Sequence, residues 1–145
     1  MGNREAVSAK VYDILAANFD AELHDRGGYT LRQDSVQMFV YVNQWSKQPD
    51  GPVTIKFSCP ILFDLQPSPE LFEHLAVHAD DYLFGHLSAF SSDAGAVTIF
   101  FTHNILGDFL DEEELTSTIR LMLGTADQLD DELKEQFGGE RFHDD

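Results

Sequence analysis

Apolar residues near the C-terminal end recur in alternating steps of three and four, the spacing of one face of an α-helix. They are Leu115, Ile119, Met122, Ala126, Leu129, Leu133 and Phe137. Asp111 and Glu114 have the spacing of a capping box before this pattern, and Gly138-Gly139 can end the helix. The pattern predicts about 27 helical residues, a rod of roughly 40 Å. This exceeds what a small domain needs to cover its sheet, so we expect it to offer a surface to a partner.

Two shorter helices are predicted from the same period. The first covers residues 4–19, and its apolar stripe consists of Val7, Val11, Ile14, Leu15 and Phe19. Before the second helix, Ser68 suits the N-cap and Pro69 the first helical position. The expected buried positions of the second helix are Leu71, Phe72, Leu75, Ala76 and Ala79.

Period-two alternation predicts strands in the stretches between the helices. The expected strands are a short one near Leu23 and the ranges 29–32, 36–45, 53–63, 83–90 and 96–104. Turns are indicated at Gly27-Gly28, Asp34-Ser35, residues 48–52 and residues 91–95. Pro60 has no backbone donor, so its strand is expected to run along an edge or to bend there.

Strands in runs, with helices between the runs, indicate an α+β fold. The predicted order is α-β-β-β-α-β-β-α, with an antiparallel sheet of about five strands and three helices packed mainly on one face. A chain of 145 residues fits one domain, which we assign to residues 1–139. Residues 140–145 are expected to form a mobile acidic tail.

The sheet face away from the helices is expected to be rich in aromatic side chains. The alternation assigns to it Phe39, Tyr41, Trp45, Lys56, Phe84, His86, Phe90, Phe100 and Thr102. Such a surface is rarely left to water, so we expect a partner protein, a docked peptide or a second copy of the chain to cover it. The candidate partner-binding residues are Phe39, Tyr41, Trp45, Phe84, His86, Phe90 and Phe100.

The chain is strongly acidic, with 26 Asp and Glu residues against 9 Lys and Arg and a formal net charge of −17. This charge repels the phosphate backbone of nucleic acids and the surface of anionic membranes, so both are disfavoured as partners. No apolar run approaches the roughly 18 residues of a membrane span. The acidity is compatible with solubility, with adaptation to high salt or with selection of a basic partner.

The N-terminus and the cysteine count indicate a compartment. Residues 1–5 lack the basic and then apolar pattern of a secretory signal. Cys59 is the only cysteine, so no disulfide can form within the chain. We therefore expect a reducing, cytoplasmic setting.

Several short segments resemble a known family. They are Leu83-Phe84-Gly85-His86-Leu87, Thr98-Ile99-Phe100-Phe101, Gly107-Asp108-Phe109-Leu110-Asp111-Glu112-Glu113-Glu114-Leu115, Ala126-Asp127 and Phe137-Gly138-Gly139. With them the chain resembles the YbjN family over about residues 5 to 139, and more closely its actinobacterial branch, described as type III secretion chaperone-like. The resemblance implies a small cytoplasmic protein, often dimeric, that binds a peptide or protein client without chemical turnover.

Paired ionisable residues on the predicted helices are candidates for a metal site. His74 and His78 are four residues apart, a spacing that can place two imidazoles on one metal ion. A third ligand would have to come from elsewhere, and the alternative is a solvent-facing pair opposite the apolar stripe. The adjacent Asp130 and Asp131 diverge on a helix and are expected on a solvated face.

Candidates for catalysis lie on the predicted strands. His86 and His103 could act with Asp108 or Asp111 as acid and base, or could be satisfied by neighbouring backbone groups. Cys59 could be a nucleophile only beside a base in an electropositive pocket. Its alternating apolar strand favours a buried, inert thiol.

The sequence thus favours a non-catalytic, chaperone-like or regulatory adaptor that binds a peptide or protein client, forms a homodimer and needs no cofactor or metal. The first alternative is a homodimeric structural module whose aromatic face is covered by its own copy. The second is a small-ligand or metal-binding protein that uses the histidines.

Overall fold

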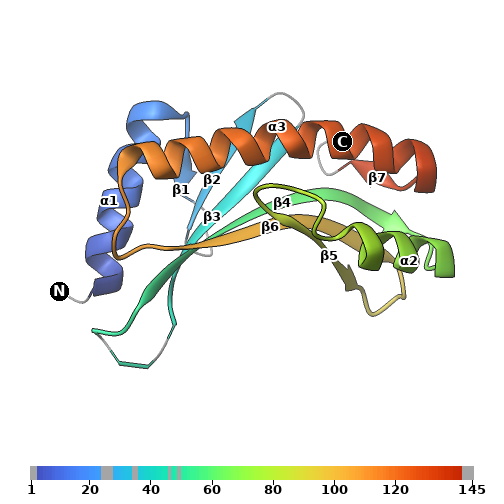
Figure 1. Ribbon diagram of the computed structural model, residues 1–145, viewed down its shortest axis with the longest axis horizontal. Helices are drawn as coiled ribbons and strands as arrows, with labels where there is room; N and C mark the ends of the chain where they lie inside the picture. The colour runs from blue at the N-terminus through green and yellow to red at the C-terminus, as the bar shows by residue number, and fades with distance from the viewer. Residues whose placement is uncertain (1–2, 24–27, 34–35, 46, 49, 142–145) are drawn as a thin grey trace.

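The computed structural model describes residues 3–23, 28–33, 36–45, 47–48 and 50–141. In chain order its elements are α1 (Asn3–Asn18), β1 (Glu22–Leu23), β2 (Tyr29–Gln33), β3 (Val36–Gln44), β4 (Val53–Leu65), α2 (Pro69–His78), β5 (His86–Ser91), β6 (Val97–Leu106), α3 (Glu112–Phe137) and β7 (Glu140–Arg141) (Figure 1). This is the α+β order predicted from the sequence. The predicted turn at Asp34-Ser35 and residue Gly27 lie outside the described residues.

The strands form one antiparallel sheet in the order β1-β2-β3-β4-β6-β5, and β7 pairs with β4. The sheet has seven strands instead of about five, because β1 and β7 add two-residue strands to it. β3 pairs with the first half of β4, and β7 pairs with Leu62 and Phe63 in its second half. Glu140 and Arg141, which the sequence assigned to the tail, therefore belong to the sheet, and residues 142–145 lie outside the described residues.

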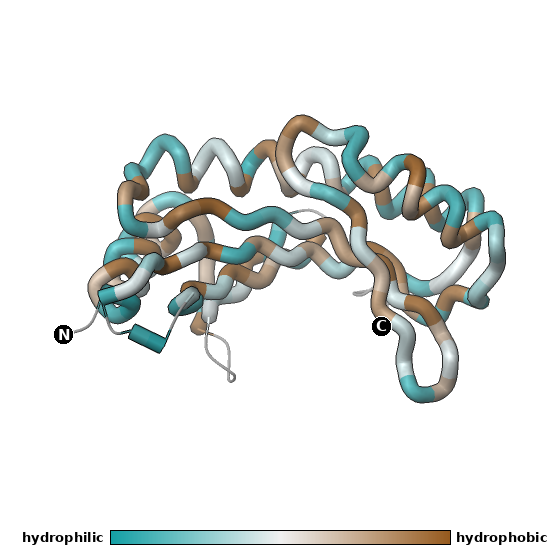
Figure 2. The backbone as a smooth tube through the Cα atoms, turned by 60° about the horizontal axis from the view of Figure 1, so that its bottom comes forward, coloured by the Kyte–Doolittle hydropathy of each residue, from teal (hydrophilic) through white to brown (hydrophobic). Residues whose placement is uncertain are grey.

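The three helices pack on one face of this sheet. In Figures 1 and 2 the long helix α3 runs along one side of the strands, with α1 near one end of the sheet and α2 near the other. The strand register places Val40 beside Phe57, and Cys59 beside Phe101, and all four side chains are fully buried. Residues from each helix join them in a single core cluster, as in Val11, Leu71 and Ile119 of α1, α2 and α3. The predicted one-sided layering is confirmed.

Helix α3 packs against the rest of the protein along almost its whole length. Its buried positions run from Leu115 to Leu133, because the helix crosses the sheet and also contacts α1. The expectation that part of this helix is surplus to the domain is therefore wrong. Its ends follow the prediction: the Asp111 carboxylate accepts a hydrogen bond from the Glu114 N–H at 2.7 Å, and Gly138 has φ +78°.

Helix α2 begins as predicted but buries less than predicted. The Ser68 hydroxyl caps its N-terminus by accepting from the Leu71 N–H at 3.1 Å. Only Leu71 and Leu75 are buried, whereas Phe72 is 45% exposed, because this short helix contacts the end of the sheet with a narrow stripe. Pro60 lies in a strand with neighbours on both sides, and the register shifts just after it, so the strand bends there and is not an edge.

Candidate peptide-binding face

The second face of the sheet carries most of the aromatic residues predicted for it. Strand pairing places Phe39 beside Ser58, Ser58 beside Thr102, and Thr102 beside His86, which forms one row across four strands. By the same register the face also carries Tyr41, Lys56, Pro60, Ser88, Phe90 and Phe100. We call this surface the outer face, and it lies opposite the helix layer.

Aromatic side chains flank small hydroxyl side chains on the outer face. The Phe39 and Tyr41 rings lie nearly parallel, with centroids 6.3 Å apart. Phe100 is partly exposed on β6, and Phe90 is 62% exposed on the edge strand β5. The His86 Nε2 and Thr102 Oγ1 atoms lie within hydrogen-bond distance, at 3.1 Å. Ser58 and Thr102 are themselves buried, so the face offers apolar contact together with the exposed imidazole of His86.

Trp45 follows β3 and continues its register, since its backbone N–H donates to the Pro52 carbonyl next to the Gln44–Val53 pair. By the alternation it lies on the side of Tyr41, at the end of the sheet, with its side chain 76% exposed. One predicted residue occupies another position. Phe84 packs against the core, and its ring meets that of His103 edge-on at 5.6 Å. His103 pairs with the buried Phe57, so Phe84 lies on the helix side of the sheet and not on the outer face.

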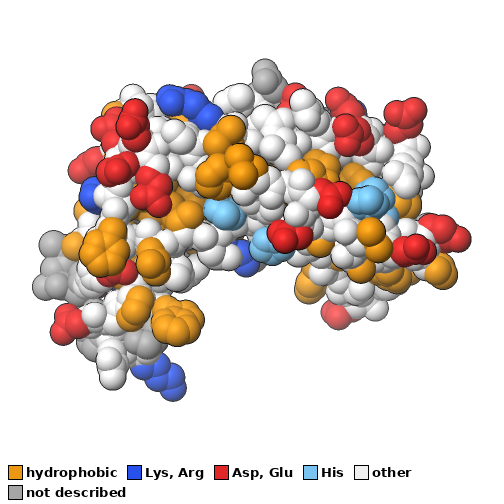
Figure 3. Space-filling view, viewed as in Figure 1, with side chains coloured by type: hydrophobic (Ala, Val, Ile, Leu, Met, Phe, Trp, Pro, Cys, Tyr) orange, Lys and Arg blue, Asp and Glu red, His pale blue; other side chains and the backbone are white. Residues whose placement is uncertain are grey.

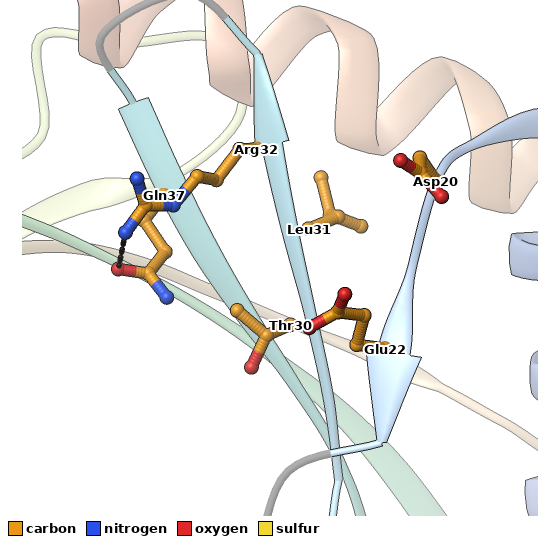
Figure 4. A pocket seen from close by; sticks show the side chains of 6 residues that line it. All are labelled: Asp20, Glu22, Thr30, Leu31, Arg32 and Gln37. Atoms are coloured by element: carbon orange, nitrogen blue, oxygen red, sulfur yellow. Dashed lines mark hydrogen bonds between the residues drawn. The ribbon is translucent and has the colours of Figure 1, made fainter.

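A cavity of about 380 Å³ lies at the β1–β2–β3 edge of the sheet. Its lining is drawn in Figure 4 and consists of Asp20, Glu22, Thr30, Leu31, Arg32 and Gln37. An Arg32 N–H donates to the Gln37 amide oxygen at 3.5 Å, and Thr30 pairs with Phe39 across the strands. The cavity therefore lies next to Phe39 of the outer face. No sequence signal pointed to it, because β1 is only two residues long and shows no alternation.

The helix histidines are held by ordinary contacts. His78 Nδ1 lies 2.7 Å from the Asp81 carboxylate, and the His74 ring lies 5.3 Å from that of Phe137. His74 thus faces the end of α3 and is only partly exposed, whereas His78 is exposed as expected. Burial together with His78 lowers the pKa of His74. Within the described residues, no three His, Cys, Asp or Glu side chains are grouped as a metal site would require.

The strand histidine His103 is satisfied by the backbone. Its Nδ1 accepts a hydrogen bond from the Gly85 N–H at 3.2 Å, and burial together with His86 lowers its pKa. The candidate carboxylates serve the fold instead: Asp111 caps α3, and Asp108 accepts from the Val53 N–H at 2.9 Å. The arrangement therefore favours the structural alternative for these residues over an acid–base pair.

The thiol of Cys59 is buried and chemically quiet. Its side chain is fully inaccessible within the core, and burial raises its pKa to about 12. A thiol with that pKa stays protonated at neutral pH, and the thiolate is the reactive form. The prediction of a buried cysteine is confirmed.

A partly exposed aromatic sheet face is typical of a surface that binds another molecule. A family model described as "T3SS (YopN, CesT) and YbjN peptide-binding chaperone 1" matches residues 3–145. The chain belongs to this family of peptide-binding chaperones, as its short segments had indicated. No curated protein matches its sequence. No helix in the described ranges is long and apolar enough to cross a membrane.

Proposed function

We propose that this protein holds a peptide segment of a client protein on its outer face and performs no chemical reaction on it. The observation that carries the proposal is the set of aromatic side chains Phe39, Tyr41, Phe90 and Phe100 on the sheet face opposite all three helices, in a chain that belongs to a peptide-binding chaperone family. Side chains of the client would pack on Phe39, Tyr41 and Phe100, since apolar contact is what this face offers.

The acidity of the chain favours basic clients. The net charge of −17 attracts positively charged segments over long distance and repels acidic ones. It also disfavours close association of many copies. We include in the proposal a cytoplasmic setting and a homodimer, both expected from the sequence and the resemblance.

The proposal is tested with peptides selected on the wild-type protein from a random-peptide library. The affinity of a selected peptide is then measured by fluorescence anisotropy for Tyr41→Ala and Phe100→Ala. Each substitution removes one aromatic contact, so each is expected to weaken binding about tenfold, or roughly 1.4 kcal/mol. Phe72→Ala is the control, because Phe72 is an aromatic residue on the helix side that is even more accessible than Tyr41 and Phe100.

The control separates three outcomes. Loss of binding in Tyr41→Ala and Phe100→Ala, with Phe72→Ala unchanged, supports the outer face. The reverse pattern places the peptide on the helix layer and contradicts the proposal. If the two outer-face substitutions convert a dimer to a monomer in light scattering and leave peptide affinity unchanged, the face joins two copies of the chain instead.

A further inference from the structure

A second exposed apolar surface lies at one end of the sheet, where β6 leads into α3. It is a groove of about 310 Å³, lined by Asp50, Pro52, Leu106, Asp108 and Phe109. Phe109 is 84% exposed and Leu106 is 56% exposed. We call this surface the end groove. Figure 3 shows apolar side chains gathered at the left of the view, over the β3–β4 hairpin and the end of β6, with acidic side chains above and beside them and a Lys or Arg side chain below.

The backbone fixes Phe109 in this exposed position. The Gly107 N–H donates to the Val53 carbonyl at 2.8 Å, and the Leu110 N–H donates back to the Gly107 carbonyl. Leu110 fills the core position beneath the turn and is only 2% exposed. The turn is held at Gly107 by the hydrogen bond to Val53 and at Leu110 by burial of its side chain. Phe109, between them, is therefore directed outward.

Apolar surface continues from the end groove toward the hairpin. Leu106 pairs with Thr54, and Pro52 lies two residues before Thr54, just ahead of β4. The Trp45 N–H donates to the Pro52 carbonyl at 3.0 Å, so this tryptophan, which directly follows β3, lies beside Pro52. Three exposed large apolar residues, Trp45, Leu106 and Phe109, are thereby brought to the same end of the sheet from separate parts of the sequence.

Carboxylates set the charge of the end groove. Asp50 and Asp108 line it, and hydrogen bonds from the Val53 N–H and the Asn3 side chain hold the Asp108 carboxylate in place. Acidic residues 111–114 follow directly after Phe109 and its neighbour Leu110. A second copy of the chain would bring the same acidic rim against itself, which is unfavourable. A basic occupant would be attracted.

We propose that the end groove binds a segment of a partner protein in which a large apolar side chain stands next to Lys or Arg. The apolar side chain would lie between Pro52, Leu106 and Phe109, and the cation would meet Asp50 or Asp108. The end groove adjoins the outer face, because Leu106 and Thr54 lie on the same side of the sheet as Lys56. It goes beyond the outer-face function, because its lining contains neither Tyr41 nor Phe100.

The test is a selection from a random-peptide phage library. Phage that bind the Phe109→Ser variant are first removed, and the remaining phage are selected for binding to the wild-type protein. Phe109 and Leu83 are similarly exposed, at 84% and 88%, so Leu83→Ser is the matched control for loss of an exposed apolar side chain. Enriched peptides are expected to combine a large apolar residue with Lys or Arg. A synthetic enriched peptide should bind at least about tenfold more weakly to Phe109→Ser and unchanged to Leu83→Ser. Asp50→Asn should weaken binding at low salt more than at high salt.

The results distinguish the end groove from the outer face. Peptides that keep their affinity for Tyr41→Ala and lose it for Phe109→Ser support the end groove. An absence of enrichment, or enrichment of acidic peptides, contradicts it. Peptides that depend on Tyr41 alone contradict the end groove and leave the outer-face proposal standing. A dimer that becomes a monomer in Phe109→Ser shows that a second copy occupies the groove, which also overturns the inference.

Discussion

Phe100 and Phe101 are neighbours in β6 whose side chains lie on opposite faces of the sheet, so their substitutions test the layering. Phe101 is fully buried, meets the Tyr82 ring edge-on at 5.2 Å and pairs with Cys59 and Leu87 on the flanking strands. The Gly85 backbone also lies against its ring, since a Cβ at Gly85 would stand 2.5 Å from Phe101 Cζ. These neighbours are held by the sheet and cannot close a cavity easily.

Phe101→Ala is therefore expected to lower the free energy of unfolding by about 4 kcal/mol. Phe100→Ala removes a partly exposed ring and is expected to cost about 1 kcal/mol. With a urea m-value of about 2 kcal/mol/M, the unfolding midpoints should fall by about 2 M and about 0.5 M respectively. The transitions are followed by far-ultraviolet circular dichroism. Equal losses, or a larger loss for Phe100→Ala, would show that the two sheet faces have been assigned the wrong way round.

Three further substitutions test individual elements. Met122→Asp places a charge at a fully buried position of α3, so far-ultraviolet circular dichroism should show an unfolded chain; a folded variant would refute the packing of this helix. Asp111→Ala removes the acceptor for the Glu114 N–H and should cost about 1 kcal/mol in urea unfolding; an unchanged midpoint would mean that the cap contributes nothing. The pKa of His103 is lowered in the folded chain, so the imidazole takes up a proton more readily in the unfolded chain. The free energy of unfolding therefore does not depend on His103 above the usual pKa of 6.5, and it decreases as the pH falls below that value. His103→Gln should make the unfolding midpoint less dependent on pH in that range, and an unaltered dependence would contradict this origin.

The helix starts and the buried strand face could be predicted because their signals are local. Ser68 and Asp111 each cap a helix through a backbone N–H three residues ahead, which fixes the helix start by sequence spacing alone. Val40 and Val42 alternate with polar or aromatic neighbours, so period two was sufficient to place them on the core face. In the candidate site, Tyr41 and Phe100 were placed on the outer face by the same alternation.

Other features depend on pairings that no local signal encodes. Phe84 was misplaced because Gly85, with φ +94°, interrupts the alternation just before β5 begins. Glu140 and Arg141 form a strand only because β4 extends past β3 and offers an open edge there. Asp130 is 4% exposed and not on a solvated face, because Arg141 of that same strand brings its Nε within 3.7 Å of the carboxylate.

The central claim is that a peptide client binds to the outer face of the sheet. It is tested most directly by aromatic proton–carbon correlation NMR of the wild-type protein during titration with a library-selected peptide. The signals of Phe39, Tyr41 and Phe100 are expected to shift together in proportion to the bound fraction, while those of Tyr12 and Phe72 on the helix side stay in place. Shifts confined to Tyr12 and Phe72 would contradict the claim.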